Sequence, residues 1–181
     1  MTPTGTKFYE THHKDEEKKG TAYTHSMIYS PNVVIMRNEF GEWDEPYAVG
    51  MVTSAAVNAG VLRQRVARDQ DVDALIEGLM RERMGRILGL FKLQGRRTLV
   101  LGSFGTGEWK RTNIFLPLTT CVNLTGVFRN SVSMVAAIWA DLLKADGPYD
   151  GVFEEVTFAI LGRQTYDEFR TTFHKRLNYK D

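Results

Sequence analysis

The stretch TLVLGSFGTG, residues 98–107, decides how the second half of the chain folds. It begins with apolar residues typical of a buried strand and then places three glycines within its last six residues. A strand that enters a glycine-rich loop usually lets the backbone approach a ligand closely, most often a ligand that carries phosphate. On this pattern alone, a phosphate loop and a simple turn are equally compatible with the sequence.

The two common phosphate motifs do not fit this loop. A P-loop needs Gly-Lys-Ser/Thr after its last glycine, whereas Gly107 is followed by Glu108. A dinucleotide-binding fingerprint that starts at Gly105 needs a glycine where Lys110 stands. Any phosphate site here must therefore be of another kind.

Composition limits the class of protein. A chain of 181 residues with 43% hydrophobic residues fits one domain with a real core, and its net charge of +1 gives no sign of nucleic-acid or membrane binding. The single cysteine, Cys121, excludes an internal disulfide and a cysteine-based zinc site. We expect a soluble cytoplasmic or nuclear protein that needs no cofactor.

The first 26 residues are expected to form a polar arm, because the run HKDEEKK is typical of a solvated or disordered segment. His12, His13 and His25 lack further ligands at helical spacing, so we expect no metal site. Residues 27–181 then form the folded part of the chain.

The folded part begins with β structure. Residues 27–37 contain two short apolar runs broken by a Ser-Pro-Asn turn. Residues 47–55, YAVGMVTSA, form an almost unbroken apolar run and are predicted to be a strand buried on both faces. This strand ends in the small-residue loop SAAVNAG, residues 54–60.

The remaining elements alternate between helix and strand. Apolar residues at three- and four-residue spacing predict a helix over 70–94, which Gly95 ends. After the strand at 98–101, a second helix is expected from an Asn130 N-cap, followed by a buried strand in 153–161 and a last helix opened by a Thr165–Glu168 capping box. This order predicts an α/β fold with a mostly parallel sheet, whose ligands bind at the carboxyl ends of strands.

Four segments resemble, in order and spacing, the microbial-type poly(ADP-ribose) glycohydrolase family. They are MIYSPNVVIMR (27–37), EPYAVGMVTSAAVNAG (45–60), RMGRILGLFKLQGRRTLVLGSFGTG (83–107) and VFRN (127–130). The resemblance covers nearly the whole chain from Phe8 to Phe173. It implies a macrodomain-like three-layer α/β/α fold with a mixed, mostly parallel central sheet.

The chain departs from the family pattern after the glycine loop. In the family the loop runs directly into Val-Phe-Arg-Asn, whereas here an irregular insertion at about 108–126 separates the two segments. A retained intron in a eukaryotic gene would explain so clean an interruption. A real surface excursion is an equal alternative, because long loop insertions cost little closure entropy. Sequencing the transcript across this region would distinguish them.

The family's catalytic element is a glycine run followed by Gln-Glu-Glu, whose second glutamate acts as the general acid. Nothing similar precedes Met27, and the adjacent Glu16 and Glu17 follow neither a glutamine nor a glycine run. The catalytic residues are therefore unknown. We expect the chain to start just after the catalytic loop and to be truncated at its N-terminus relative to the family.

The resemblance also implies a set of ADP-ribose contacts. The glycine loop would wrap the diphosphate, the ring of Phe128 would lie near a ribose, and Asn58 would contact the ligand from the pocket wall. The implied site residues are Gly102, Ser103, Phe104, Gly105, Thr106, Gly107, Phe128 and Asn58. Three alternatives remain open: the glycines only turn the chain, Phe128 packs in the core, and Asn58 only forms an Asx-type turn.

Two functions follow from these residues. The first is an ADP-ribose-binding macrodomain of the glycohydrolase family, which cleaves ribose–ribose or ribosyl–protein bonds, with weak or no activity in this chain. The second is a non-catalytic reader of ADP-ribose, poly(ADP-ribose) or ADP-ribosylated proteins. A third possibility is a poorly folding chain, because a sheet without its first strands exposes an unpaired edge.

Overall fold

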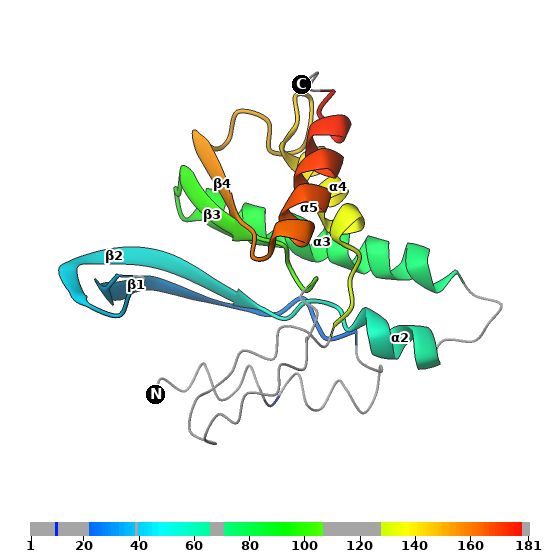
Figure 1. Cartoon of the computed structure of the whole chain (residues 1–181), viewed down its shortest axis with the longest axis horizontal. Coiled ribbons are helices and arrows are strands. Elements are labelled where there is room, and N and C mark those ends of the chain that lie inside the picture. The colour runs from blue at the N-terminus through cyan, green and yellow to red at the C-terminus, as the bar shows by residue number, and fades with distance from the viewer. Residues whose placement is uncertain (1–9, 11–21, 39, 66–70, 107–127, 179–181) are drawn as a thin grey trace.

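The computed structural model describes residues 10, 22–38, 40–65, 71–106 and 128–178 (Figure 1). The predicted α/β class is confirmed, because the described chain combines helices with strands, and its second half alternates between them. The elements are β1 (Met27–Arg37), β2 (Trp43–Ser54), α2 (Ala59–Arg65), α3 (Val72–Leu93), β3 (Thr98–Gly102), α4 (Val132–Leu143), β4 (Glu155–Ala159) and α5 (Arg163–Arg176). None of the described helices is long and apolar enough to cross a membrane.

The body of the protein is built around β3, β4 and three helices. Strands β3 and β4 pair in parallel, with Leu99 opposite Val156 and Gly102 opposite Ala159. Leu99 and Leu101 on one face of β3 are buried, whereas Val100 between them is exposed. Helices α3, α4 and α5 lie together beside this pair (Figure 1). The fully buried side chains of the core come mainly from α3 and α4: Ile76, Met80, Met84, Leu88, Val135, Ile138 and Trp139.

Strands β1 and β2 form an antiparallel hairpin that extends away from the body (Figure 1). Met27, Tyr29 and Val52 at its base pack against the core. Farther out, Tyr47 is 57% exposed and Met51 is 44% exposed, so the prediction that residues 47–55 are buried on both faces is wrong. An unbroken apolar run predicts a strand, but it does not determine whether other elements cover that strand.

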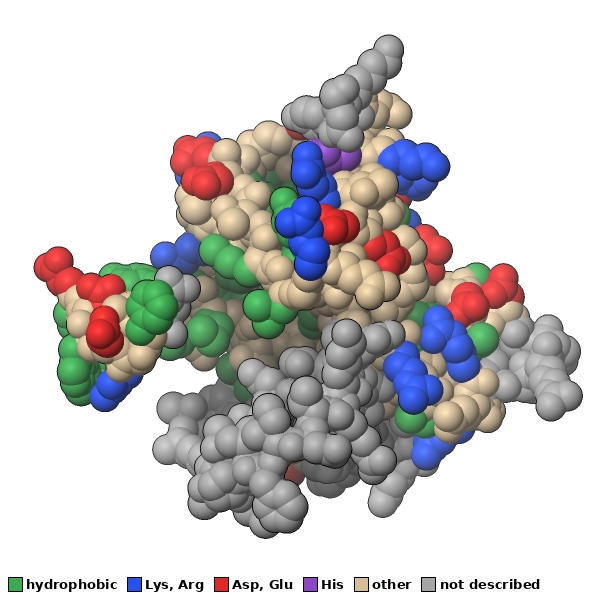
Figure 2. All heavy atoms as spheres, viewed as in Figure 1, with side chains coloured by type: hydrophobic (Ala, Val, Ile, Leu, Met, Phe, Trp, Pro, Cys, Tyr) green, Lys and Arg blue, Asp and Glu red, His purple; other side chains and the backbone are tan. Residues whose placement is uncertain are grey.

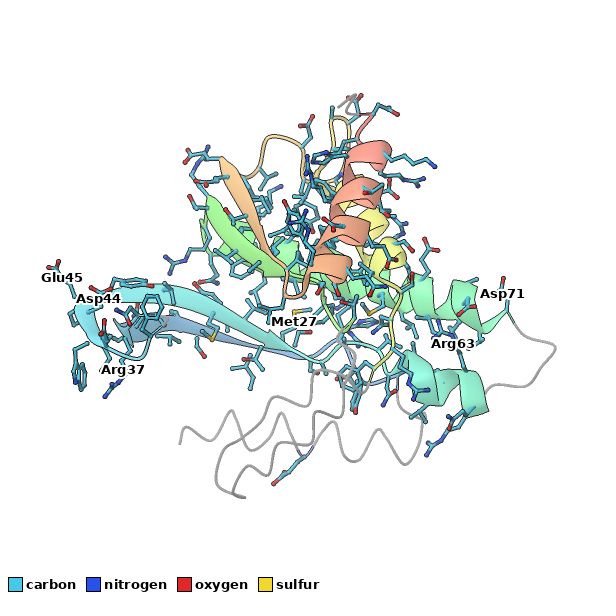
Figure 3. All side chains as sticks on the ribbon, in the orientation of Figure 1. Met27, Arg37, Asp44, Glu45, Arg63 and Asp71 are labelled. Atoms are coloured by element: carbon cyan, nitrogen blue, oxygen red, sulfur yellow. The ribbon has the colours of Figure 1, made fainter. Side chains whose placement is uncertain are left out.

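The tip of the hairpin carries charged residues, as Figure 3 shows for Arg37, Asp44 and Glu45. The Arg37 guanidinium lies 4.3 Å from the centre of the Trp43 ring, a cation–π contact across the paired strands. With this contact in place, Trp43 is still 70% exposed.

Helix α3 has the ends that its sequence predicts. Asp71 is its N-cap, and the Asp71 carboxylate accepts a hydrogen bond from the Ala74 N–H at 3.1 Å. Gly95 follows the last turn with φ +64°, the left-handed conformation expected of a glycine that ends a helix. The helix therefore leaves its last turn in the direction that starts β3.

Two predicted N-caps are wrong. The N-cap of α4 is Ser131 instead of Asn130, and the Ser131 hydroxyl accepts a hydrogen bond from the Met134 N–H at 3.2 Å. Helix α5 begins at Arg163, after Gly162 with φ +84°, and has no side-chain cap, so no Thr165–Glu168 capping box opens it. Helix α4 thus begins one residue later than predicted and α5 begins three residues earlier, differences that propensity alone does not resolve.

Arg83 joins α3 to two segments that are distant in sequence. Its side chain is completely buried and donates hydrogen bonds to the carbonyl oxygens of Ala55 at 2.7 Å, Ala22 at 2.9 Å and Tyr23 at 3.1 Å. Its Nε also lies 3.4 Å from Nδ1 of His25. Burial lowers the pKa of Arg83 to about 10, so it remains charged at neutral pH. Residues 22–25, within the predicted polar arm, are thus packed against α3.

Asp141 on α4 joins the three helices through charge. Its carboxylate accepts hydrogen bonds from Arg176 on α5 at 2.8 and 3.0 Å, from Lys144 at 3.2 Å and from Arg81 on α3 at 3.2 Å. The hydrogen bond from Arg176, together with those from Lys144 and Arg81, holds the pKa of Asp141 well below its usual range. The side chain of Asp141 is only 10% exposed, which limits solvent screening of these contacts.

We expect Asp141→Asn to destabilise the fold by about 1–2 kcal/mol, because it removes charge-assisted hydrogen bonds to three cations. The carboxylate's pKa is lowered by folding. Its contribution is therefore fully present above the unfolded-state value of about 4 and is lost as the pH falls below it. Urea unfolding at pH 7 and pH 3 measures both effects, with the exposed Glu168→Gln on α5 as a control. Equal unfolding free energies for Asp141→Asn and wild type at pH 7 would contradict this prediction.

We expect Arg83→Met to cost at least about 2 kcal/mol, because it leaves three carbonyl oxygens without their donor. Arg83→Lys should lose less stability than Arg83→Met, because its ammonium group keeps a charged donor. It should still be less stable than wild type, because that group cannot reach all three oxygens. Thermal unfolding followed by circular dichroism ranks the three proteins. A lysine variant as unstable as the methionine variant would show that the charge, without the guanidinium geometry, contributes nothing.

Candidate functional site

The glycine loop forms a tight turn directly after β3. The Thr106 N–H donates to the Ser103 carbonyl at 2.9 Å, and the Thr106 hydroxyl donates to the same oxygen at 2.7 Å. Gly105 has φ +75°, whereas Phe104 does not have a positive φ. Residues 103–106 therefore form a hydrogen-bonded turn whose third position, with its positive φ, favours glycine.

The two glycines of the loop that the structure describes have different roles. A Cβ on Gly105 would lie 2.5 Å from the Ala56 Cβ and 2.6 Å from the Asn130 Nδ2, so both the positive φ and the packing require glycine there. A Cβ on Gly102 would meet only the Ala159 carbonyl oxygen, at an ordinary 3.8 Å. Gly107 and the insertion at 108–126 lie outside the described residues.

The turn presents two backbone donors. Its internal hydrogen bond uses the Thr106 N–H, and within the described part of the chain the N–H groups of Phe104 and Gly105 have no hydrogen-bond partner. Successive backbone N–H groups in turns can form anion-binding concavities in proteins. Such a site needs no charged side chain. The turn also lies at the carboxyl end of β3, the edge at which α/β folds bind ligands.

Asn130 connects the turn to the loop that follows β2. Its Nδ2 donates to the Val57 carbonyl at 2.8 Å and to the Gly105 carbonyl at 3.2 Å, and its backbone N–H donates to the Gly105 carbonyl at 3.3 Å. Asn130 is only 4% exposed. Its use in these contacts explains why Ser131, and not Asn130, caps α4.

Asn58 lies in the same loop but uses its side chain locally. The Asn58 Oδ1 accepts a hydrogen bond from the Val61 N–H at 3.2 Å, and the residue is 6% exposed. This contact satisfies a donor at the start of α2, as an Asx-type cap does. A direct contact of Asn58 with a ligand remains a prediction.

Phe128 is brought beside this loop by its backbone. Its carbonyl accepts a hydrogen bond from the Gly60 N–H at 3.1 Å. Its half-buried ring packs edge-on against Tyr23, with ring centres 5.7 Å apart. Tyr23 has φ +52°, an uncommon conformation for a bulky residue.

The next residue, Arg129, also has a left-handed backbone, with φ +51°, and its carbonyl accepts a hydrogen bond from the Arg63 Nη1 at 3.1 Å. Arg63 belongs to α2, over which Figure 2 shows positively charged side chains. It also pairs with Asp73 at the start of α3 at 2.9 Å, and Figure 3 labels Arg63 and the N-cap Asp71 in this region. Arg63 thereby connects helix α2 to the segment 128–130 and to α3.

The structure therefore gathers three segments that are far apart in sequence: residues 54–60, 102–106 and 128–130. They contain seven of the eight predicted site residues, Asn58, Gly102, Ser103, Phe104, Gly105, Thr106 and Phe128. Sequence reasoning missed the role of Asn130. The VFRN motif contains this residue, but its side-chain partners lie 73 and 25 positions away, and no local spacing indicates such contacts.

The chemistry of these segments suits binding more than proton transfer. Their polar contacts are made by backbone, amide and hydroxyl groups and by the Arg63 guanidinium. Among the described residues, no group of three or more His, Cys, Asp or Glu side chains could hold a metal ion. The surface depressions along α4 and α5 share no lining residue with the turn.

Comparison with known proteins gives matches among solved structures. No protein-family model matches the chain, and neither does any curated protein sequence. The poly(ADP-ribose) glycohydrolase from Deinococcus radiodurans, solved in complex with ADP-ribose, is 29% identical with a TM-score of 0.74, and the match covers 98% of this chain and 61% of that one. Its apo form gives 29% identity, a TM-score of 0.73 and coverages of 98% and 62%.

A second bacterial enzyme is similar to the same degree. The poly(ADP-ribose) glycohydrolase from Thermomonospora curvata, solved with a bound inhibitor, is 30% identical with a TM-score of 0.70, over 94% of this chain and 55% of that one. The chain thus spans about three fifths of the length of the Deinococcus enzyme. The resemblance predicted from the sequence is confirmed: this chain is a structural relative of the microbial-type poly(ADP-ribose) glycohydrolases.

Proposed function

We propose that this chain binds ADP-ribose, with the diphosphate held at the turn of residues 103–106. The observation that carries the proposal is the pair of N–H groups of Phe104 and Gly105 at the carboxyl end of β3, which have no hydrogen-bond partner among the described residues. The fold around this turn is similar to that of an enzyme solved in complex with ADP-ribose. Uncharged backbone donors suit a diphosphate, because several can converge on its oxygens.

The neighbouring residues fit the other parts of the ligand. Phe128 lies beside the same loop as the turn, so its ring could order a ribose, as the family resemblance implies. Helix α4 begins at Val132, two residues after Asn130, and its N-terminus adds positive potential. Asn58 would line the wall from the start of α2.

Whether the bound ligand is also cleaved depends on a general acid. The family hydrolyses ribose–ribose or ribosyl–protein bonds, and a positioned acid typically contributes roughly 10²–10⁴-fold to such a rate. These 181 residues contain no Gln-Glu-Glu sequence. We therefore propose weak or no hydrolysis by this chain. The second candidate, a reader of ADP-ribose or of ADP-ribosylated proteins, is favoured by the same observation.

Isothermal titration of the purified chain with ADP-ribose tests the binding proposal. We expect one saturable site with a dissociation constant in the micromolar range, about −7 to −8 kcal/mol, and at least about tenfold weaker binding of adenosine monophosphate. The monophosphate lacks the second phosphate and the distal ribose, so it should lose contacts at the turn and near Phe128. No heat with either ligand at high protein concentration would refute the proposed site.

Release of free ADP-ribose from poly(ADP-ribose) separates the two candidates. A reader should bind the polymer and release no ADP-ribose above the rate in buffer, whereas a complete glycohydrolase should release it catalytically. We expect the reader's result for the isolated chain, with turnover at least about 10²-fold below that of the Deinococcus enzyme assayed in parallel. Turnover equal to that enzyme would show that the chain supplies its own general acid.

A further inference from the structure

The carboxamide of Asn130 has only one possible orientation. Both groups near its Nδ2 are carbonyl oxygens, those of Val57 at 2.8 Å and Gly105 at 3.2 Å, and only the amide nitrogen can donate to them. Its Oδ1 is buried and has no hydrogen-bond partner among the described residues. A buried acceptor without a donor carries a cost, so the nitrogen's two contacts must determine how this side chain lies.

Asn130, which is not part of the turn, restrains the turn through the Gly105 carbonyl. The Gly105 carbonyl accepts hydrogen bonds from both the backbone N–H and the Nδ2 of Asn130, and the other end of the same peptide, the Thr106 N–H, donates to Ser103. The peptide between Gly105 and Thr106 is therefore bonded at both ends. The turn cannot move relative to Val57 without breaking at least one of the Asn130 contacts.

Gly105 and Asn130 are matched sterically as well. The space where a Gly105 side chain would begin is taken by the Asn130 Nδ2 at 2.6 Å and the Ala56 Cβ at 2.5 Å. The glycine thus allows the amide to reach both carbonyls. A serine at position 130 would be too short to reach both, and an aspartate would have no donor to offer.

We propose that Asn130 is the positioning residue of the ADP-ribose site: its carboxamide fixes the turn that presents the Phe104 and Gly105 N–H groups to the diphosphate. This inference rests on the proposed function. It assigns Asn130 no contact with the ligand. The residue acts through Gly105, and its loss should weaken diphosphate binding by more than its effect on stability explains.

The test compares Asn130→Leu with Asp141→Asn. Leucine has a similar size but no donor, whereas Asp141 stabilises the helices and its carboxylate binds, among the described residues, Arg81, Lys144 and Arg176. We expect both variants to have lower melting temperatures. Asn130→Leu should also lose at least about tenfold in ADP-ribose affinity, whereas Asp141→Asn should stay within about twofold of wild type. Equal affinity of Asn130→Leu and wild type would overturn the proposal.

Amide hydrogen exchange gives a second readout that needs no ligand. The Thr106 amide, protected by its bond to Ser103, should exchange faster in Asn130→Leu than in Asp141→Asn. If the wild type binds no ADP-ribose but this difference is present, the proposed function fails and the positioning of the turn by Asn130 stands. If Thr106 exchanges at the same rate in both variants, the positioning role is refuted whatever the wild type binds.

Discussion

The buried guanidinium of Arg83 is the interaction on which the rest of this structure depends. It projects from α3 and binds three backbone carbonyls from two segments that are distant in sequence. Ala55, which it holds, precedes the Ala56 side chain that abuts Gly105, and Tyr23, which it also holds, packs against Phe128. One buried cation thus supports both sides of the candidate site. Its desolvation is offset by three carbonyl acceptors, as buried charges require.

The loop after β2 is held from both sides. On one side are two residues of α3: Arg83 binds the Ala55 carbonyl, and the Met80 sulfur lies 3.5 Å from the Val57 N–H. On the other side, Asn130 binds the Val57 carbonyl. Successive residues of one loop therefore connect the apolar core of α3 to the glycine turn. A change in the packing of Met80 or Arg83 would reach the turn through residues 55–57 and the hydrogen bonds of Asn130, because a close-packed interior transmits displacement.

The sequence predicts well whatever depends on neighbours along the chain. Helix α3, its Gly95 end and strand β3 follow from apolar periodicity and from the φ that glycine permits, and both signals are local. The exposure of Tyr47 and Met51 was not predictable in this way, because it depends on whether another element covers the hairpin.

In the candidate site, too, features set by neighbours in sequence are predictable and those set by tertiary contacts are not. The glycine turn was visible in the sequence, whereas its support was not. The type and position of Asn130 predict a helix cap, but its tertiary contacts with Val57 and Gly105 outweigh that local preference. For Asn58 the sequence allows either a ligand contact or an Asx-type turn. Its Oδ1 accepts a hydrogen bond from the nearby Val61 N–H, a contact that local spacing does indicate.

The chemistry of the turn explains why its support matters so much. A lysine or arginine attracts phosphate over several ångströms and tolerates small displacements, whereas a backbone N–H contributes only at hydrogen-bond distance and with good alignment. At this turn the donors are the uncharged backbone N–H groups of Phe104 and Gly105. Affinity and selectivity at such a site must come from geometry. Arg83 and Asn130 fix this geometry by binding the loop after β2 and, for Asn130, the turn itself. They therefore determine binding as much as any residue that would touch the ligand.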